Sequence, residues 1–135
     1  MPIKKKILVV DDDETVRSLL CEFLAAEGFG ARAVGSGESA LALLRKRHFG
    51  AVIADYEMPG MNGAELISEI RSRNPYLFII GISASGSGSA RYFMRVGADF
   101  FFSKPFQLED VLLALKIHFW PSSQILTDET LRRGI

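Results

Sequence analysis

Short runs of apolar residues alternate along the chain with longer segments in which apolar residues recur at helical spacing. Four runs are continuous, as in strands that helices cover on both faces: residues 7–10, 51–54, 78–82 and 99–102. Residues 29–34 form a weaker strand candidate. The pattern therefore predicts five strands.

A segment of helical periodicity follows each predicted strand. The first carries an apolar stripe that ends at Gly28 and consists of Val16, Leu19, Leu20, Phe23 and Leu24. Further helices are expected over residues 40–44, 66–70, 90–96 and 108–118. Five strand–helix units in succession predict a doubly wound α/β domain with a parallel sheet and helices on both faces. We assign residues 1–118 to this domain and leave residues 119–135 as a C-terminal tail without a role.

Composition argues against several classes of protein, among them those that bind nucleic acid or membranes through an overall charge and those held together by disulfides. Sixteen basic and sixteen acidic side chains cancel, so no overall field would attract nucleic acid or anionic lipid. Cys21 is the only cysteine, which excludes an internal disulfide, and its place among apolar helix positions favours a packing role. The basic and apolar residues at 4–10 are too few for a signal peptide or a membrane span. We therefore expect a cytoplasmic protein.

Polar residues recur at the carboxyl ends of the predicted strands, where open parallel sheets bind their ligands. They are Asp11, Asp12 and Asp13 after the first strand, Asp55 after the third, Ser83, followed by Ala84, after the fourth, and Lys104, followed by Pro105, after the fifth. Carboxylates gathered in one cleft disfavour ionisation unless a cation neutralises them. A ligand set of oxygens alone suits magnesium and argues against zinc. A nearby lysine and hydroxyl would suit transfer of a phosphoryl group to a carboxylate.

Four of these runs resemble the receiver domain of two-component response regulators. They are "ILVVDDD", "VIADYEMPGMNG", "GISAS" and "FFFSKPF", in this order and each at a strand end. The resemblance covers about residues 6–118 and implies a flavodoxin-like, five-stranded sheet of order 2-1-3-4-5 with five helices. It also implies a signalling switch in a phosphorelay, which assists its own phosphorylation and dephosphorylation but is not an enzyme.

The resemblance further implies a role for each matching position. Asp55 would accept the phosphoryl group, and Asp11, Asp12, Asp55 and the backbone carbonyl of Glu57 would hold Mg²⁺. Ser83 and Lys104 would contact the phosphoryl group, and Ser83 and Phe101 would form the switch. The peptide bond before Pro105 would be cis.

The implied partners are a sensor histidine kinase or phosphotransfer protein and a downstream protein. The latter would bind the face made by the fourth helix, fifth strand and fifth helix. We expect a monomer or weak homodimer, with no membrane contact. We also expect no direct contact with nucleic acid, because no helix-turn-helix segment follows the domain.

Some of these residues also have a purely structural interpretation. Asp13 is expected to cap the first helix, and Phe100 and Phe102 to be buried strand residues. Phe101 is either a switch or a core residue. Met58, Pro59 and Gly63 are expected to shape a loop rather than to contact a ligand. Lys104 is hard to explain as an ordinary surface lysine, because it lies between a buried strand and a proline.

Two other functions compete with the receiver interpretation. Asp11, Asp13 and Thr15 also match the Asp-x-Asp-x-Thr motif of haloacid dehalogenase-like phosphatases, in which Asp11 would be the nucleophile. Against it, the helical stripe begins at Val16 and leaves no room for the extra turn of those enzymes. The other alternative is a receiver-like binding module that never carries phosphate. Glu57 bears on it, since its charge is expected to repel a phosphoryl group or attacking water.

Overall fold

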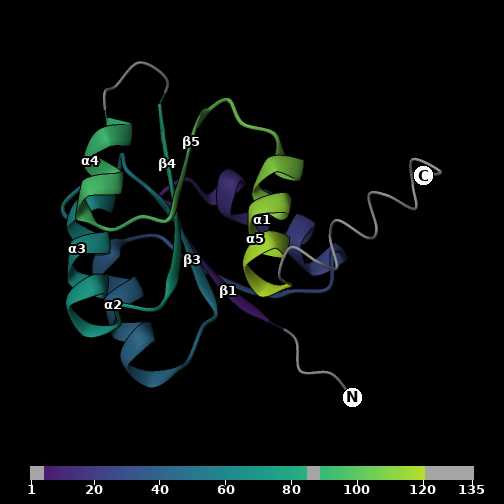
Figure 1. Cartoon of the computed structure of the whole chain (residues 1–135), viewed down its shortest axis with the longest axis horizontal. Helices are drawn as coiled ribbons and strands as arrows, with labels where there is room; N and C mark the ends of the chain where they lie inside the picture. Colours follow the sequence, from purple (N-terminus) through teal and green to yellow (C-terminus); the bar gives the residue numbers. More distant parts are fainter. Residues whose placement is uncertain (1–4, 85–88, 121–135) are drawn as a thin grey trace.

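The computed structural model describes residues 5–84 and 89–120, and within them one parallel sheet carries helices on both faces (Figure 1). The strands are β1 (Lys6–Val10), β2 (Gly30–Val34), β3 (Ala51–Asp55), β4 (Phe78–Ala84) and β5 (Phe100–Lys104). The helices are α1 (Glu14–Ala26), α2 (Gly37–Lys46), α3 (Gly63–Arg73), α4 (Ser89–Val96) and α5 (Leu108–Phe119). The sheet order is β2-β1-β3-β4-β5, with every pairing parallel. The predicted fold class is confirmed.

Successive side chains along each strand point to opposite faces of the sheet, and so the core consists of two clusters, one on each face. Leu8, Val52 and Ile79 pack with α2, α3 and α4 on one face. Their neighbours Val9 and Ile53 pack with α1 and α5 on the other face. Figure 1 shows this division, with α1 and α5 on the opposite side of the strands from α2, α3 and α4. Because the central strands carry no polar side chain except near their ends, polar chemistry is confined to those ends.

The prediction that Phe100 is buried is wrong, and Leu19 of the predicted apolar stripe is also exposed. Leu19 is 52% exposed, because the face of α1 that packs on the sheet is centred on Leu20 and Leu24. Phe100 is 39% exposed, because β5 is the last strand of the sheet and, within residues 5–84 and 89–120, no further strand covers its outer side. Phe102 is half-buried, so it does belong to the core layer beside α5.

The last helix extends one residue further than the sequence predicted. α5 continues to Phe119, whose ring centroid lies 6.1 Å from that of Phe29. The ring centroid of Trp120 lies 5.9 Å from that of Phe29. Both rings therefore pack against Phe29. Residues 121–135, the rest of the predicted tail, lie outside the described residues.

Helix starts follow local capping rules. The Asp13 carboxylate accepts from the backbone N–H of Thr15 at 2.9 Å, so the predicted cap of α1 is confirmed. Asn62 and Glu65 form a capping box at the start of α3. Cys21 is half-buried against the α1–α5 cluster, in agreement with its predicted packing role. In the described part of the chain, no helix has the length and apolar character that a membrane crossing needs.

Candidate functional site

Strand register brings the polar residues of four strand ends, those of β1, β3, β4 and β5, to one edge of the sheet. Val10 pairs with Ala54, so Asp11 and Asp55 follow paired residues on neighbouring strands. Asp55 itself pairs with Ile82, the residue before Ser83. On the next strand, Ala84 pairs with Lys104. Residues far apart in sequence therefore meet because parallel strands end at the same edge.

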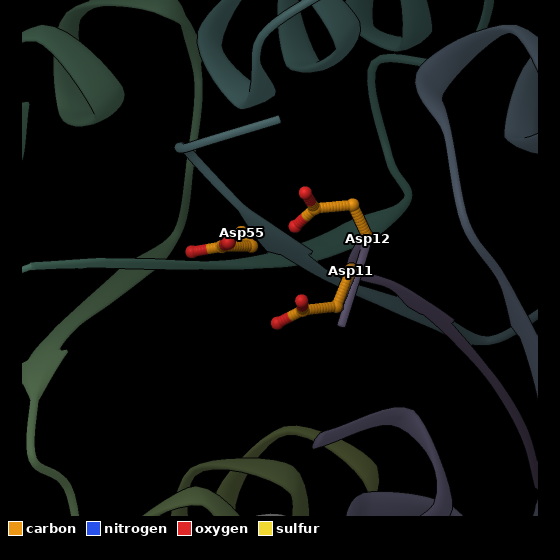
Figure 2. A group of neighbouring side chains, drawn as sticks. All are labelled: Asp11, Asp12 and Asp55. Atoms are coloured by element: carbon orange, nitrogen blue, oxygen red, sulfur yellow. The ribbon is translucent and has the colours of Figure 1, made fainter. Parts of the chain in front are cut away.

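Three carboxylates form the centre of the site. Asp11, Asp12 and Asp55 each offer an oxygen, and these atoms all lie within 4.8 Å of one another. Figure 2 shows the three side chains extending to the same side of the strand ends. Asp11 and Asp55 are buried, whereas Asp12 is exposed.

Burial makes the inner carboxyls harder to ionise. It raises the pKa of Asp55 to about 6, with the negative charge of Asp11 adding to the effect and Lys104 opposing it. Burial also raises the pKa of Asp11, although the hydrogen bond from the Asp13 backbone lowers it in part. The pair is thus destabilised as two anions and would gain from a cation.

Lys104 supplies one positive charge. Its Nζ lies 3.2 Å from Asp55 Oδ1, and its side chain is about one third exposed. Burial lowers the pKa of the Lys104 ammonium, but the charges of Asp55 and Asp11 outweigh burial and the pKa is raised. Among the described residues, no donor makes a well-oriented hydrogen bond to the buried Asp55 Oδ1. One ammonium therefore satisfies the carboxylates incompletely.

Backbone contacts fix the positions of the acids. The Asp13 N–H donates to Asp11 Oδ1 at 2.9 Å, and Arg17 Nη1 donates to the Asp11 carbonyl at 2.7 Å. After Asp55, the loop folds tightly enough that a Cβ on Gly63 would lie 2.3 Å from the Asp55 carbonyl oxygen. Only glycine fits there without movement of the backbone. Sequence reasoning named Gly63 as loop geometry but missed that the loop closes directly on Asp55.

Glu57 engages the end of β4. Its Oε2 accepts from Ser83 Oγ at 2.6 Å, and its Oε1 accepts from the backbone N–H of Ala84 at 2.8 Å. Ser83 is fully buried. The sequence placed Glu57 near the site but did not predict this contact, in which one carboxylate accepts from two donors.

Comparison with known proteins agrees with this geometry. The family model described as "Response regulator receiver domain" matches residues 7–116. The chain belongs to this family. Response regulator protein FleR of Pseudomonas aeruginosa is 39% identical over 108 residues, which are 79% of this chain and 23% of FleR. The chain spans half or less of the length of the curated relatives that it matches first.

Solved structures of other receivers have the same architecture. The receiver domain of NtrX from Brucella abortus gives a TM-score of 0.80 at 33% identity, with 86% of this chain and 99% of that chain covered. The chemotaxis response regulator CheY4 of Vibrio cholerae gives 0.78 at 29% identity, with 84% and 98% covered. Membership of the receiver family disfavours the phosphatase alternative. In accord with this, α1 begins at Glu14, directly after its cap.

The donor set of this receiver fits a hard divalent cation. The acids supply oxygens only, two of them are buried, and Asp55 Oδ1 lacks a well-placed donor within the described residues. These features match the ligands that Mg²⁺ prefers. Asp11, Asp12 and Asp55 are therefore the side chains that could hold it.

Phe101 lies half-buried on the α2–α4 face of the receiver. Its ring centroid is 5.6 Å from that of Phe93. Phe93 in turn lies over Gly81, where a Cβ would come within 2.9 Å of the ring. Gly81 and Ser83 are two positions apart on β4, so Ser83 and the Phe93–Phe101 pair share one face of the strand.

The remaining sequence assignments can be placed as well. The Lys104–Pro105 peptide bond is cis, the geometry that the resemblance implied. Met58 is buried in the α2–α4 cluster, so it is a core residue as well as part of the loop. Pro59 is exposed in that loop.

Proposed function

We propose that this receiver domain accepts a phosphoryl group from a phosphohistidine of a histidine kinase or phosphotransfer protein. The acceptor is the carboxylate of Asp55. The observation that carries the proposal is the grouping of this buried carboxylate with Asp11 and Asp12 on one side and the Lys104 ammonium on the other. An ordinary surface ion pair would not bury two acids beside each other.

The transfer requires the residues of the pocket to orient the acceptor and offset charge. An Asp55 carboxylate oxygen forms a bond to phosphorus while the phosphorus–nitrogen bond of the donor breaks. The donor imidazole keeps that electron pair. Lys104 would balance the charge of the phosphoryl oxygens, and Ser83 Oγ would donate a hydrogen bond to one of them. Mg²⁺, held by Asp11, Asp12, Asp55 and the Glu57 carbonyl, would neutralise the remaining negative charge when bound.

The product is a signal rather than a released metabolite. Phosphorylation would favour the state in which Ser83 and Lys104 engage the phosphoryl group, and Phe101 would repack as Ser83 moves. The surface of α4, β5 and α5 would then bind a downstream protein. The domain thus acts as a switch and a substrate, and helps catalyse its own phosphorylation and hydrolysis.

Several wider assignments accompany this role. The receiver is proposed to act in the cytoplasm, as a monomer or weak homodimer, and without direct contact with nucleic acid. The net charge of zero is consistent with recognition through local surfaces rather than through an overall field.

Labelling with acetyl phosphate and Mg²⁺ tests the phosphoacceptor. Wild type and Asp11→Asn should be compared with Asp55→Ala, and only Asp55→Ala should lose label completely. If Asp55→Ala still takes up label and Asp11→Asn does not, the proposed acceptor is wrong.

A pull-down with and without beryllofluoride and Mg²⁺ tests the switch. A partner that binds only the beryllofluoride form supports it. Identical capture under both conditions would favour a receiver-like module that binds independently of phosphate.

A further inference from the structure

Glu57 lies in an exposed loop, yet both oxygens of its carboxylate accept hydrogen bonds from another part of the chain. The side chain comes from the loop after β3 and reaches the end of β4, 26 residues further along the chain. Its two oxygens accept from two different donors, Ser83 Oγ at 2.6 Å and Ala84 N at 2.8 Å. Both distances lie in the range of charge-assisted hydrogen bonds.

The same two donors would suit a phosphoryl group. A carboxylate and a phosphoryl group both present adjacent oxygens that share negative charge, so a hydroxyl and a backbone N–H that fit one can fit the other. Ile82, which precedes Ser83, pairs with Asp55. The backbone N–H of Tyr56, the residue after Asp55, donates to the Ile82 carbonyl at 2.8 Å. The donor pair therefore lies next to the proposed phosphoacceptor.

Electrostatics place the Glu57 carboxylate within reach of the same centre. Its charge contributes to the raised pKa of Asp55 and to the raised pKa of Lys104. In both shifts the contribution of Glu57 is smaller than that of the other acids, Asp11 for Asp55 and both Asp55 and Asp11 for Lys104.

We propose that the Glu57 side chain is an internal competitor, which occupies the Ser83–Ala84 donors until a phosphoryl group on Asp55 displaces it. This inference rests on the proposed function of Asp55. It differs from simple repulsion, because a competitor acts through its hydrogen bonds and not through charge alone. Glu57 is therefore a positioning residue that sets how tightly the phosphorylated state is held.

The contact also bears on the switch. Ser83 shares its face of β4 with Gly81, over which Phe93 and then Phe101 pack. While Glu57 holds Ser83, the carboxylate supplies the anchor that the phosphoryl group would otherwise supply. Displacement thus exchanges one anionic anchor for another at the same two donors.

The contact itself is tested without any phosphoryl chemistry. The amide proton of Ala84 should be followed by NMR in metal-free wild type, Glu57→Ala and Glu57→Gln, with Glu22→Ala on the exposed face of α1 as control. Loss of the carboxylate should move the Ala84 signal upfield and speed its exchange with solvent. If the Ala84 signal is the same in wild type and Glu57→Ala, the inference is overturned and the proposed function of Asp55 is untouched.

Competition is tested by titrating the same proteins with beryllofluoride in the presence of Mg²⁺. We expect Glu57→Ala to bind about tenfold more tightly than wild type, which corresponds to about 1.4 kcal/mol. Glu57→Gln should lie between them, because its amide keeps one acceptor oxygen and can hold only one donor. Glu22→Ala should match wild type.

The outcomes separate the two claims. Equal affinity of wild type and Glu57→Ala overturns competition. Equal gains in Glu57→Gln and Glu57→Ala also overturn it, and leave charge repulsion as the explanation. If Asp55→Asn binds beryllofluoride as wild type does, the proposed function fails and competition for its phosphoryl group fails with it.

Discussion

The Lys104 ammonium lies 3.2 Å from the buried Oδ1 of Asp55, at the point where β5 and β3 reach the same edge of the sheet. The two residues are 49 positions apart in the sequence. Because the net charge of the chain is zero, the electrostatic field at this edge comes from the few charged groups that the fold brings together there.

Removal of the ammonium should slow phosphorylation. We expect Lys104→Ala to lower the rate of labelling by acetyl phosphate by about 100-fold, because one fixed charge at the transferring group is lost. Lys46→Ala, at the exposed end of α2, is the matched control and should react at the wild-type rate. Wild-type labelling by Lys104→Ala would remove the lysine from the mechanism.

The ionisation of Asp55 should make stability depend on pH. The folded-state pKa of about 6 exceeds the ordinary value of 3.8, so the folded state holds this proton more tightly than the unfolded state does. The contribution of Asp55 to stability is therefore lost as pH rises from about 4 to about 6. In metal-free buffer, Asp55→Asn should exceed wild type in stability by about 1 to 3 kcal/mol at pH 7, and by almost nothing at pH 3.5.

Urea denaturation of both proteins over this pH range measures the difference. A gap that stays constant from pH 3.5 to pH 7 would show that the Asp55 carboxyl titrates normally in the folded protein.

Magnesium should stabilise the folded protein through the same acids. Adding Mg²⁺ at neutral pH should raise the midpoint of thermal unfolding, because the ion binds the folded state and not the unfolded chain. Asp11→Asn should reduce the shift strongly. Asp13→Asn should keep it, because asparagine caps a helix as well as aspartate does and Asp13 belongs to the cap of α1. A reduced shift in Asp13→Asn equal to that in Asp11→Asn would contradict the division of these acids.

Gly63 should tolerate no side chain. We expect Gly63→Ala to lower the free energy of unfolding by about 2 to 4 kcal/mol, since its Cβ would meet the backbone carbonyl of Asp55. Gly35→Ala is the control and should cost less than about 1 kcal/mol, because its Cβ would come no closer than 3.2 Å to Arg17 Nη1, a contact that a shift of a few tenths of an ångström relieves. Equal losses in the two variants, measured by urea denaturation, would show that the loop after β3 can relax.

The sequence predicted most of the fold because the strands are nearly continuous apolar runs and helix caps follow local rules. An apolar run does not show how fully its neighbours cover each side chain, so the run at residues 100–102 predicts burial of Phe100, which the structure leaves 39% exposed. Leu19 illustrates a related limit, because a broad apolar stripe does not show which of its edges faces the sheet.

The site was predictable in composition but not in contacts. Acids, a hydroxyl and a lysine at strand ends indicate a pocket, because parallel strands end together. The contact of Glu57 with Ser83 and Ala84 depends on how one loop folds over another strand, and no local pattern encodes that. The pairing of Phe119 and Trp120 with Phe29 likewise joins the end of α5 to the loop before β2.

The most direct test of the central claim is to locate the acyl phosphate. The protein should be phosphorylated with Mg²⁺ and a phosphohistidine donor, reduced with borohydride, and digested for mapping of the reduced residue by mass spectrometry. The account predicts reduction at Asp55 alone, while modification at Asp11 with Asp55 unchanged would contradict it.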